Sequence, residues 1–274
     1  MKSKNNNSNT LQIETVPGVR TTEYISIRKG DPVNIKDEIV DEALACISLN
    51  GMELANFMCS PRDLDKLALG FLYNEGIIDT IEDIESLHLS KSNCVDIWID
   101  KEFDLPEIKI ITAGCGGGVT FDDLSTRHQP LYTDATTTPA KLSALMKQVH
   151  LGSKLYQRAG GIHTAALSDG NKLLLQVEDM GRHNCIDKLA GAALQDKIDT
   201  ANKILFSSGR ISSEMINKAR RMEIPIVCSR TSPTSVSIDL AKEWNMTIVG
   251  YLRQKNMRIY SAPDRIKLES GITE

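Results

Sequence analysis

Residues 203–229, KILFSSGRISSEMINKARRMEIPIVCS, hold the pattern that decides the fold. Two apolar runs, KILFSS and IPIVCS, flank a segment from about Ser212 to Arg221 that is predicted to be an amphipathic helix. A second such helix is expected from about Pro233 to Trp244, and the apolar run TIVGYL follows it. Short apolar strands that alternate with amphipathic helices predict a sheet with parallel last strands and helices on both faces.

The residues before this stretch extend the same α/β domain, which we expect over residues 138–274. Thr138-Pro139 has the residue types of a helix start, and apolar residues follow at helical spacing. HTAALSDGNKLLLQVE, residues 163–178, predicts a hairpin that turns at Asp169-Gly170. A further helix is expected from about Asn184. The fold class is therefore α/β, with a mixed sheet covered by helices on both faces.

The N-terminal half is predicted to be a smaller, strand-rich subdomain over residues 20–137, preceded by a disordered, Asn-rich tail at 1–19. Asn50-Gly51 lies between two apolar runs, and this dipeptide favours the type I′ turn of a hairpin. Ser60-Pro61 offers an N-cap and a first helical residue, and Gly76 a helix end. Further strands are expected around 85–90, 94–99 and 107–112.

Composition limits the class of protein. The chain has 274 residues, 41% of them hydrophobic and 25% charged, and six cysteines without a C-x-x-C pair. Such a chain is expected to be globular, with reduced thiols. Because the sequence lacks an apolar stretch of about 18 residues and a charged-then-apolar leader, we expect a cytoplasmic protein without membrane contact.

Charge is distributed unevenly along the chain. Residues 1–140 hold 12 Lys and Arg against 23 Asp and Glu, a net charge of −11, whereas residues 141–274 hold 20 against 13, a net charge of +7. A basic half fits an anionic ligand, although two solvated surfaces of opposite sign explain the counts equally well. Ligands of α/β sheets bind beyond the carboxyl ends of the strands. Those ends are polar or basic: SSGR (207–210), SRTS (229–232) and YLRQKN (251–256).

One cysteine lies in an unusual context. Cys115 is enclosed by glycines in ITAGCGGGVTF, residues 111–121. A cysteine kept for packing normally has apolar neighbours, whereas glycines allow the backbone to move or to approach another molecule. The context favours a reactive thiol. A mobile thiol suits a group carrier better than a hydrolase, whose nucleophile must be held against its base.

Other polar residues leave alternatives open. His163 opens a strand after Gly160-Gly161 and is either a general base or a buried histidine with backbone partners. The segment VEDMGRHNCIDK, residues 177–188, is either an anion site at a helix start or a salt-bridge network. Cys185 within it is expected in the core. The absence of H-x-E and C-x-x-C patterns argues against a deaminase-type zinc site, and no nucleic-acid-binding module is recognisable.

Several segments together resemble the FdhD family of formate dehydrogenase accessory sulfurtransferases, in order and spacing, over about residues 20–266. The segments are MCSPRDLDKLALGFLYNEGII (58–78), GGIHTAAL (160–167), VEDMGRHNCIDKLAG (177–191), SSGRISSEMI (207–216), IPIVCSRTSPTSVSIDLA (224–241) and TIVGYLR (247–253). The resemblance implies a fold similar to cytidine deaminase without its zinc ligands. It also implies that Cys115 accepts sulfur from a cysteine desulfurase as a persulfide. The sulfur would pass to molybdenum in bis-molybdopterin guanine dinucleotide, for formate dehydrogenase.

The resemblance also implies a cofactor-binding loop after the last strand, formed by Tyr251, Leu252, Arg253, Gln254, Lys255 and Asn256. In it, Arg253 and Lys255 would contact phosphate, and no tightly bound metal of the protein's own is implied. From the residues alone we add Arg182, at a helix start, as a phosphate ligand. One position departs from the family's C-G-x-C-G pattern, because Gly118 replaces the second cysteine. We therefore expect Cys115 to act alone.

Two other functions remain open on the sequence. The chain could be a non-catalytic chaperone for the molybdenum cofactor, or a cysteine hydrolase that pairs Cys115 with His163 or His183. Helices that are apolar on one face, together with strand edges, could support the homodimer that we expect. The sequence does not identify the desulfurase or the dehydrogenase.

Overall fold

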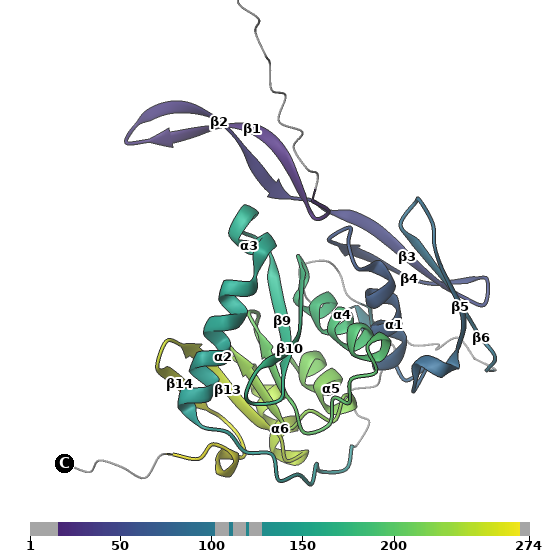
Figure 1. Ribbon diagram of the computed structural model, residues 1–274, viewed down its shortest axis with the longest axis vertical. Coiled ribbons are helices and arrows are strands. Elements are labelled where there is room, and N and C mark those ends of the chain that lie inside the picture. The colour runs from purple at the N-terminus through teal and green to yellow at the C-terminus, as the bar shows by residue number, and fades with distance from the viewer. Residues whose placement is uncertain (1–15, 102–109, 112–118, 121–127, 269–274) are drawn as a thin grey trace, which may run out of the picture.

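The structure, a computed structural model, describes residues 16–101, 110–111, 119–120 and 128–268. Cys115 and Gly118 lie outside these residues, as does most of the N-terminal tail. The largest sheet has six strands in the order β10-β9-β11-β12-β13-β14 (Figure 1). Its strands are β9 (His163–Ser168), β10 (Leu173–Asp179), β11 (Ile204–Ser207), β12 (Ile226–Ser229), β13 (Thr247–Arg253) and β14 (Asn256–Ile259).

The sheet is mixed, as expected. β11, β12 and β13 run parallel to one another, whereas β9, β10 and β14 pair antiparallel with their neighbours. Among the described residues, five α-helices follow in the same part of the chain: α2 (Pro139–Gly152), α3 (Lys154–Ala159), α4 (Arg182–Gln195), α5 (Ser213–Arg221) and α6 (Ser235–Glu243). The alternation of strands and helices in residues 203–253 is therefore confirmed.

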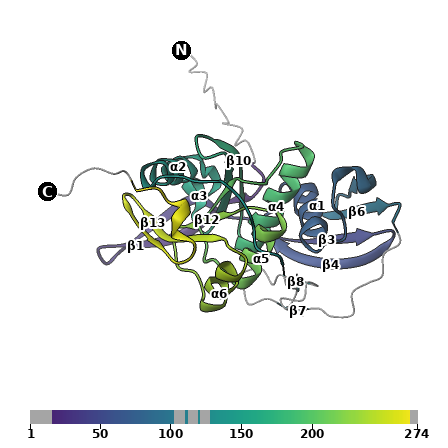
Figure 2. The same ribbon diagram turned by 90° about the horizontal axis from the view of Figure 1, so that it is seen from below.

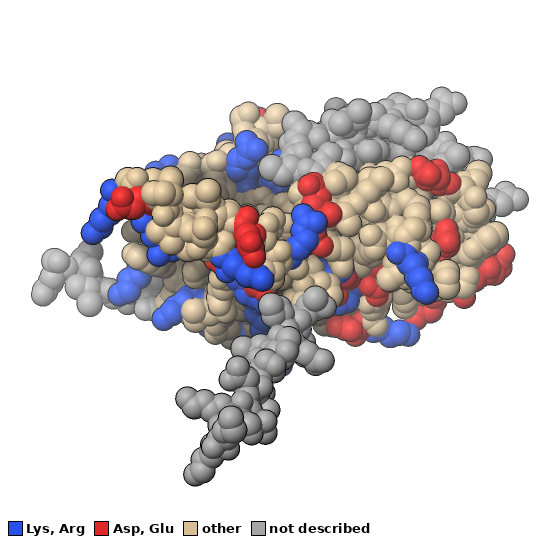
Figure 3. Space-filling view, turned by 90° about the horizontal axis from the view of Figure 1, so that it is seen from above, with Lys and Arg blue, Asp and Glu red and all other residues tan. Residues whose placement is uncertain are grey.

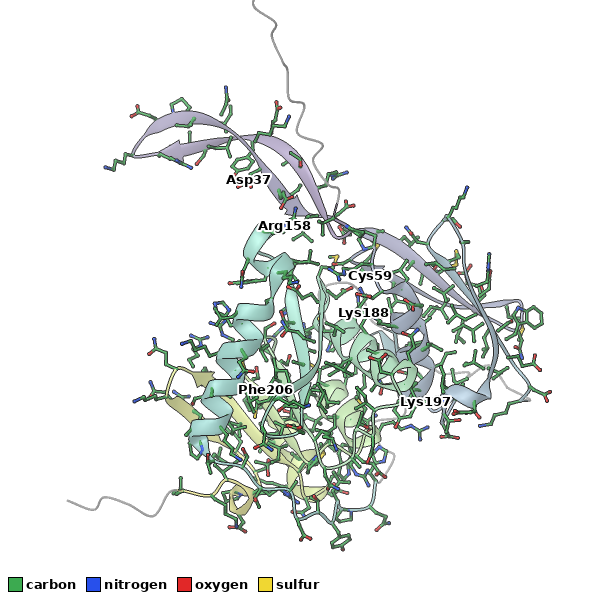
Figure 4. All side chains as sticks on the ribbon, viewed as in Figure 1. Asp37, Cys59, Arg158, Lys188, Lys197 and Phe206 are labelled. Atoms are coloured by element: carbon green, nitrogen blue, oxygen red, sulfur yellow. A yellow bond between two sulfur atoms is a disulfide. The ribbon has the colours of Figure 1, made fainter. Side chains whose placement is uncertain are left out.

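Both faces of the six-stranded sheet are buried, because successive strand residues point to opposite sides. Leu205, Val227 and Ile248 pack in one core with residues of α4, α5 and α6. Phe206 and Cys228 pack in another core with Leu142, Leu145, Met146 and Val149 of α2. Figure 2 shows helices on both sides of the sheet, and Figure 4 marks Phe206 beneath α2. The prediction of helices on both faces is confirmed.

The smaller sheet has the order β4-β3-β6-β5 and is covered by α1. Its elements are β3 (Ala43–Leu49), β4 (Met52–Cys59), β5 (Ile84–Leu89), β6 (Cys94–Ile99), α1 (Leu64–Asn74) and the short helix η1 (Ile81–Asp83). The predicted type I′ hairpin is confirmed, since Asn50 and Gly51 have φ of 50° and 80°. Two short strands, β7 (Ile110–Ile111) and β8 (Val119–Thr120), pair with each other, and η2 (Pro263–Arg265) lies near the C-terminus.

The expectation of reduced thiols is wrong for one pair of cysteines. Parallel pairing of β3 with β6 sets Cys46 opposite Cys94, and the two form a disulfide. This pairing could not be predicted from the sequence, because 48 positions separate the two cysteines. Only the pairing of two strands that are distant in the chain brings them together.

The predicted start of α1 at Ser60-Pro61 is also wrong. The helix begins at Leu64, after Asp63, whose φ is 51° and whose side chain makes no capping bond. Ser60 is buried and bonds to other elements. Its N–H donates to Asp179 Oδ2 (3.1 Å), its hydroxyl accepts from the Met180 N–H (3.1 Å), and its carbonyl accepts from Lys188 Nζ (3.2 Å). By contrast, Thr138 caps α2 as predicted, since its hydroxyl accepts from the Lys141 N–H.

A close contact between α1 and α4 joins the two sheets, and Figure 1 shows these helices side by side. Two glycines make the contact possible. A Cβ at position 70 would lie 1.7 Å from the carbonyl oxygen of Asp187, and one at position 191 would lie 1.9 Å from that of Lys66. Only glycine fits at either position. Residues 182–193 of α4 are consequently all buried, between α1 and the six-stranded sheet.

A long hairpin of β1 (Val19–Arg28) and β2 (Asp31–Val40) extends from the rest of the molecule (Figure 1). Its base contacts α3, and an ion pair joins Arg158 of α3 to Glu38. Arg158 and Asp37 are marked near this base in Figure 4. In the described part of the chain, no helix is long and apolar enough to cross a membrane.

Candidate functional site

Two adjoining cavities open where the predicted strand ends meet. The inner cavity, of about 370 Å³, lies between α2, α3, the start of β9 and the ends of β11, β12 and β13. The outer cavity, of about 780 Å³, lies between α2 and the turn that joins β13 to β14. Both volumes are within the usual range for ligand pockets. The two cavities share Met146, His150, Arg230 and Arg253, which we call the shared wall.

The charged residues that line these cavities are all cationic. Arg230 and Arg253 line both, and Lys147 and Lys255 line the outer cavity. Among the described residues, no Asp or Glu lines either one. In the view from above of Figure 3, Asp and Glu are frequent on the side of β3–β6, whereas Lys and Arg are more frequent on the opposite side, where the β1–β2 hairpin lies above the six-stranded sheet. A cationic surface without internal carboxylate partners suits an anionic ligand.

Hydrogen bonds hold the shared wall in place. Arg230 Nη1–H donates to His150 Nδ1 (3.0 Å), which ties the end of β12 to α2. Arg253 Nε–H donates to the carbonyl oxygen of Arg230 (2.9 Å). Both guanidinium groups are therefore positioned by neutral partners, and their positive charge stays available to a ligand.

His163 lies in the wall of the inner cavity. Its Nδ1 is 3.2 Å from Ser208 Oγ, which also accepts the N–H of Thr164 at 3.0 Å. Burial lowers the pKa of His163, and the nearby charges of Arg182 and Arg210 lower it further. The imidazole is thus neutral near pH 7. Among the described residues the Ser208 hydroxyl has no other acceptor for its proton, so the O–H is assigned as the donor to His163 Nδ1, which places the ring proton on Nε2.

The structure places residues 251–256 differently from the expectation. They do not follow the last strand: Tyr251 to Arg253 end β13, and β14 begins at Asn256. Arg253, Gln254, Lys255 and Asn256 line the outer cavity. Leu252 borders the same cavity, but its side chain is fully buried in the core. Tyr251 lies outside both cavities, and Arg258 stacks over its ring at 4.2 Å.

Arg182 lines neither cavity. It is the first residue of α4 and is 6% exposed. Its Cβ lies 2.8 Å from the position that a Cβ on Gly209 would occupy, and His163 Nδ1 is 3.3 Å from that same point. Arg182 therefore lies behind the wall that contains His163 and adds positive charge there. Its predicted contact with phosphate stays a prediction.

The cluster at residues 177–188 is a network of buried ion pairs, and the anion-site interpretation is wrong for its main members. Lys188 Nζ lies 2.6 Å from Asp179 Oδ2, and both side chains are fully buried. Lys218 Nζ lies 2.8 Å from Asp187 Oδ2. Glu178 accepts the N–H groups of Leu155 and Tyr156 at the start of α3. Since these charges are already paired within the protein, they are not open to a ligand.

His183 belongs to the same buried region. Its Nε2 lies 3.1 Å from Ser212 Oγ and 3.4 Å from Glu214 Oε2. Burial lowers its pKa to about 4, although Glu214 acts in the opposite direction. His183 is therefore neutral at pH 7.

The free cysteines of the described chain are packing residues. Cys59, Cys185 and Cys228 are buried, which confirms the core position predicted for Cys185. Burial raises the pKa of Cys59 to about 12 and raises those of Cys185 and Cys228 as well. Thiols in such surroundings stay protonated and are poor nucleophiles.

Sequence reasoning found part of this site. The polar strand ends contain Ser208, Arg230, Thr231 and Arg253, all of which line the inner cavity. It missed His150, which is in the last turn of α2 and far from any strand end in the sequence. Its position in the last turn of α2, directly after the buried Val149, carries no local signal for a cavity, because the contact with Arg230 depends on how α2 packs on the sheet. In the described ranges, no group of three or more His, Cys, Asp or Glu residues could hold a metal ion.

Comparisons with known proteins agree on one family. A family model described as FdhD/NarQ matches residues 40–267. The Sulfur carrier protein FdhD of Staphylococcus haemolyticus is 34% identical over 251 residues, which is 89% of this chain and 95% of that protein. The Bacillus subtilis protein of the same name is 34% identical over 247 residues, 87% and 94% of the two chains.

A solved structure is also similar. A protein from Desulfotalea psychrophila, described as a formate dehydrogenase accessory protein, superimposes with a TM-score of 0.78. The two sequences are 27% identical, and the match covers 92% of this chain and 100% of the other. The two-sheet architecture described above is therefore shared along nearly the whole length of both chains.

Proposed function

The chain belongs to the FdhD/NarQ family, and we propose that it is a cytoplasmic sulfurtransferase that carries sulfur on Cys115. A cysteine desulfurase would supply the sulfur as a persulfide. The acceptor would be the molybdenum of bis-molybdopterin guanine dinucleotide, which formate dehydrogenase needs for activity. Formate dehydrogenase and a desulfurase would be the protein partners, and the homodimer stays a prediction.

The distribution of the cysteines carries this proposal. Of the six, Cys46 and Cys94 form a disulfide, and Cys59, Cys185 and Cys228 are buried with raised pKa values. Sulfur transfer needs an accessible thiolate, and none of these five provides one. Cys115 remains, in the glycine-rich segment that favours a carrier thiol. The names of the curated relatives, all sulfur carrier proteins, support the same reading.

The loading step is an ordinary thiol exchange. The Cys115 thiolate attacks the outer sulfur of the persulfide on the donor, the sulfur–sulfur bond of the donor breaks, and the donor leaves as a thiolate. Cys115 then holds a persulfide, and no net oxidation has occurred. In the delivery step the sulfur–sulfur bond of the Cys115 persulfide would break, the outer sulfur would pass to the acceptor as sulfane sulfur, and Cys115 would leave as a thiolate. The acceptor would supply the two electrons if this sulfur is reduced to sulfide. Cys115 is then ready for another cycle.

The adjoining cavities support an acceptor with phosphate groups. Guanidinium and ammonium groups bind phosphate by charge-assisted hydrogen bonds, and Arg253 and Lys255 both line the outer cavity. Gln254 and Asn256 carry amide groups that can bond to a guanine ring. We therefore propose that the outer cavity binds the guanine nucleotide part of the cofactor.

The experiment that tests sulfur carriage is mass spectrometry after incubation with a cysteine desulfurase and cysteine. We expect Cys115 to gain the mass of one sulfur atom, which dithiothreitol removes, and we expect no gain in Cys115→Ala. The matched control is the double variant Cys46→Ser, Cys94→Ser, which should still take up sulfur. Uptake that survives in Cys115→Ala would overturn the proposal.

The same variant separates the other two functions. A non-catalytic chaperone predicts that Cys115→Ala still binds GDP and still supports formate dehydrogenase activity in cells. A cysteine hydrolase predicts that His163→Gln or His183→Gln abolishes reaction of Cys115 with an acylating probe. Sulfur carriage predicts that formate dehydrogenase activity is lost in Cys115→Ala while GDP binding is kept.

A further inference from the structure

We propose that the inner cavity is a second, separate subsite, which binds the pterin end of the cofactor and uses His163 as a neutral hydrogen-bond donor. The inference rests on the proposed function, in which the acceptor is a bis-dinucleotide; each of its two halves joins a guanine to a pterin, and the guanine of one half lies in the outer cavity. It assigns the other heterocycle of that half to the inner cavity.

The arrangement of the two cavities matches the order of parts in such a ligand. A dinucleotide of this kind has two flat heterocycles with a pyrophosphate between them. The two cavities adjoin at the shared wall, and the cations of that wall, Arg230 and Arg253, line both of them. A pyrophosphate at the shared wall would meet both guanidinium groups and leave one heterocycle on each side.

The inner cavity has the two kinds of surface that a flat polar ring requires. Met146, Val149 and Ile162 give it an apolar side, and Tyr156 and His150 contribute aromatic rings whose centroids are 5.9 Å apart. The other side is polar. Flat heterocycles bind in pockets of this composition, with the ring against apolar and aromatic groups and a few polar groups at its edge.

The polar side offers hydrogen-bond donors. The bond from Ser208 to Nδ1 leaves the ring proton of His163 on Nε2, which has no hydrogen-bond partner among the described residues. In the part of the chain that the structure describes, no carboxylate lines this cavity. The site therefore favours ring edges that carry acceptors, and the oxo group and ring nitrogens of a pterin are acceptors.

The backbone fixes His163 at this wall. Gly160 and Gly161 have φ of 66° and 60°, a conformation that favours glycine, and they turn the chain from α3 into β9. Within β9, the Thr164 N–H bonds to Ser208 Oγ. Ser208 thus connects the start of β9 to the end of β11 and also sets the tautomer of the imidazole. By this reasoning His163 binds the ligand and Ser208 is a positioning residue.

Two probes test the proposal on the full-length chain. Pterin-6-carboxylate is fluorescent and carries one heterocycle with one anionic group, and GDP carries the guanine end alone. We expect both to bind at once, so that a saturating concentration of GDP does not displace pterin-6-carboxylate. His163→Phe, which keeps an aromatic ring but has no hydrogen-bond donor, should weaken binding of pterin-6-carboxylate about 10-fold, the effect of one lost hydrogen bond. Its affinity for GDP should change by less than about twofold.

Two further variants complete the comparison. Ser208→Ala should also weaken binding of pterin-6-carboxylate and should make that binding pH-dependent, because a hydroxyl that donates to Nδ1 favours the neutral imidazole, and without it the ring takes up a proton at higher pH. Lys255→Ala, in the outer cavity only, should weaken GDP and spare pterin-6-carboxylate. Circular dichroism on each variant separates loss of binding from loss of folding.

The possible outcomes distinguish failure of the second subsite from failure of the proposed function. Competition between the two probes, or unchanged pterin-6-carboxylate binding in both folded variants His163→Phe and Ser208→Ala, would overturn the second subsite. Sulfur uptake by Cys115 is measured on the same samples. If uptake is normal but pterin-6-carboxylate does not bind, the subsite is rejected and sulfur carriage stands. If pterin-6-carboxylate binds as expected but Cys115 takes up no sulfur, the proposed function fails and the subsite stands.

Discussion

Two clusters of charged side chains lie in the C-terminal domain, and they behave in opposite ways. At the junction of β10 with α4, Asp179 and Lys188 are fully buried and contact each other at 2.6 Å. At the shared wall, Arg230 and Arg253 line cavities that contain no Asp or Glu among the described residues. The charges of the first cluster are paired within the protein, whereas the cations of the second cluster can pair with a bound ligand.

The difference separates structural charges from functional ones. Buried ions are tolerated only when they are paired and hydrogen-bonded, so every charge of the junction has a partner in the fold. Cations that line a cavity without carboxylate partners add little to the stability of the fold, but they increase the affinity of the cavity for an anion. Substitutions at the junction should therefore change folding, and substitutions at the shared wall should change ligand affinity.

The largest effect is expected from Asp179→Ala. The substitution leaves Lys188 buried without its counter-ion and removes acceptors from the N–H groups of Ser60 and Gly181. We expect the free energy of unfolding to fall by about 3–5 kcal/mol. Denaturant unfolding followed by circular dichroism measures this. The control is Glu82→Ala, which breaks an exposed pair with Lys197 and should leave stability nearly unchanged. Equal effects of the two would contradict the distinction.

A pH effect is expected from His183. Its folded pKa is about 4, against an ordinary value of 6.5, so the unfolded state takes up a proton first as the pH falls. The stability that neutral His183 provides is fully present above pH 6.5 and is lost as the pH falls from about 6.5 to 4. A shift of this size corresponds to roughly 3 kcal/mol.

His183→Gln should remove that slope. Unfolding free energies measured at several pH values between 4 and 7 test the prediction, and His88→Gln, at an exposed position on β5, is the matched control. A slope that is the same in His183→Gln and in the unmodified protein would show that other groups determine the acid response.

At the shared wall the expected effect is on binding. Arg230→Ala removes one guanidinium group from both cavities and one donor from His150, but leaves no buried charge unpaired. We expect GDP to bind about 10- to 100-fold more weakly, the range for one charge-assisted bond to phosphate. Isothermal titration calorimetry measures the affinity. The exposed Lys242 on α6 provides the control Lys242→Ala. A loss of stability instead of affinity would place Arg230 with the structural charges.

The smallest effect is expected from salt. Raising the ionic strength from about 0.1 M to 1 M shortens the screening length from about 10 Å to 3 Å. GDP binding at the open shared wall should weaken several-fold, and the stability difference between Asp179→Ala and the unmodified protein should stay the same. Titrations and unfolding curves at the two ionic strengths give both values. Salt-independent GDP binding would mean that the cations of the wall do not contact phosphate.

Much of the fold could be predicted from the sequence, because local rules determine it. The hairpin at Asn50-Gly51, the cap at Thr138 and the alternating strands and helices after residue 203 all depend on neighbours in the chain. The errors concern residues whose partners are distant. Ser60 has the chemistry of an N-cap, but bonds to Asp179, Met180 and Lys188 determine its position.

The candidate site was likewise predicted only in part. The strand-end rule found Ser208, Arg230 and Arg253, because parallel strands bring their carboxyl ends to one edge. It could not tell that residues 251–256 include the end of β13, a turn at Gln254 and Lys255, and the start of a further strand, because β14 is short and polar. The sequence also could not show that the charged residues at 177–188 form ion pairs within the protein whereas those at the strand ends do not. Which charges pair depends on the packing of α4 against α1 and α5.

The crossing of α1 and α4 at Gly70 and Gly191 affects how the protein unfolds. With no side chain between the two backbones, neither helix can shift without breaking the contact, so the halves of the chain are coupled mechanically. Heating should melt both sheets in a single cooperative transition. A fragment cut before residue 138 would leave the α1-facing side of α4 exposed to water, and the boundary between the halves, although visible in the topology, is a poor place to divide the protein.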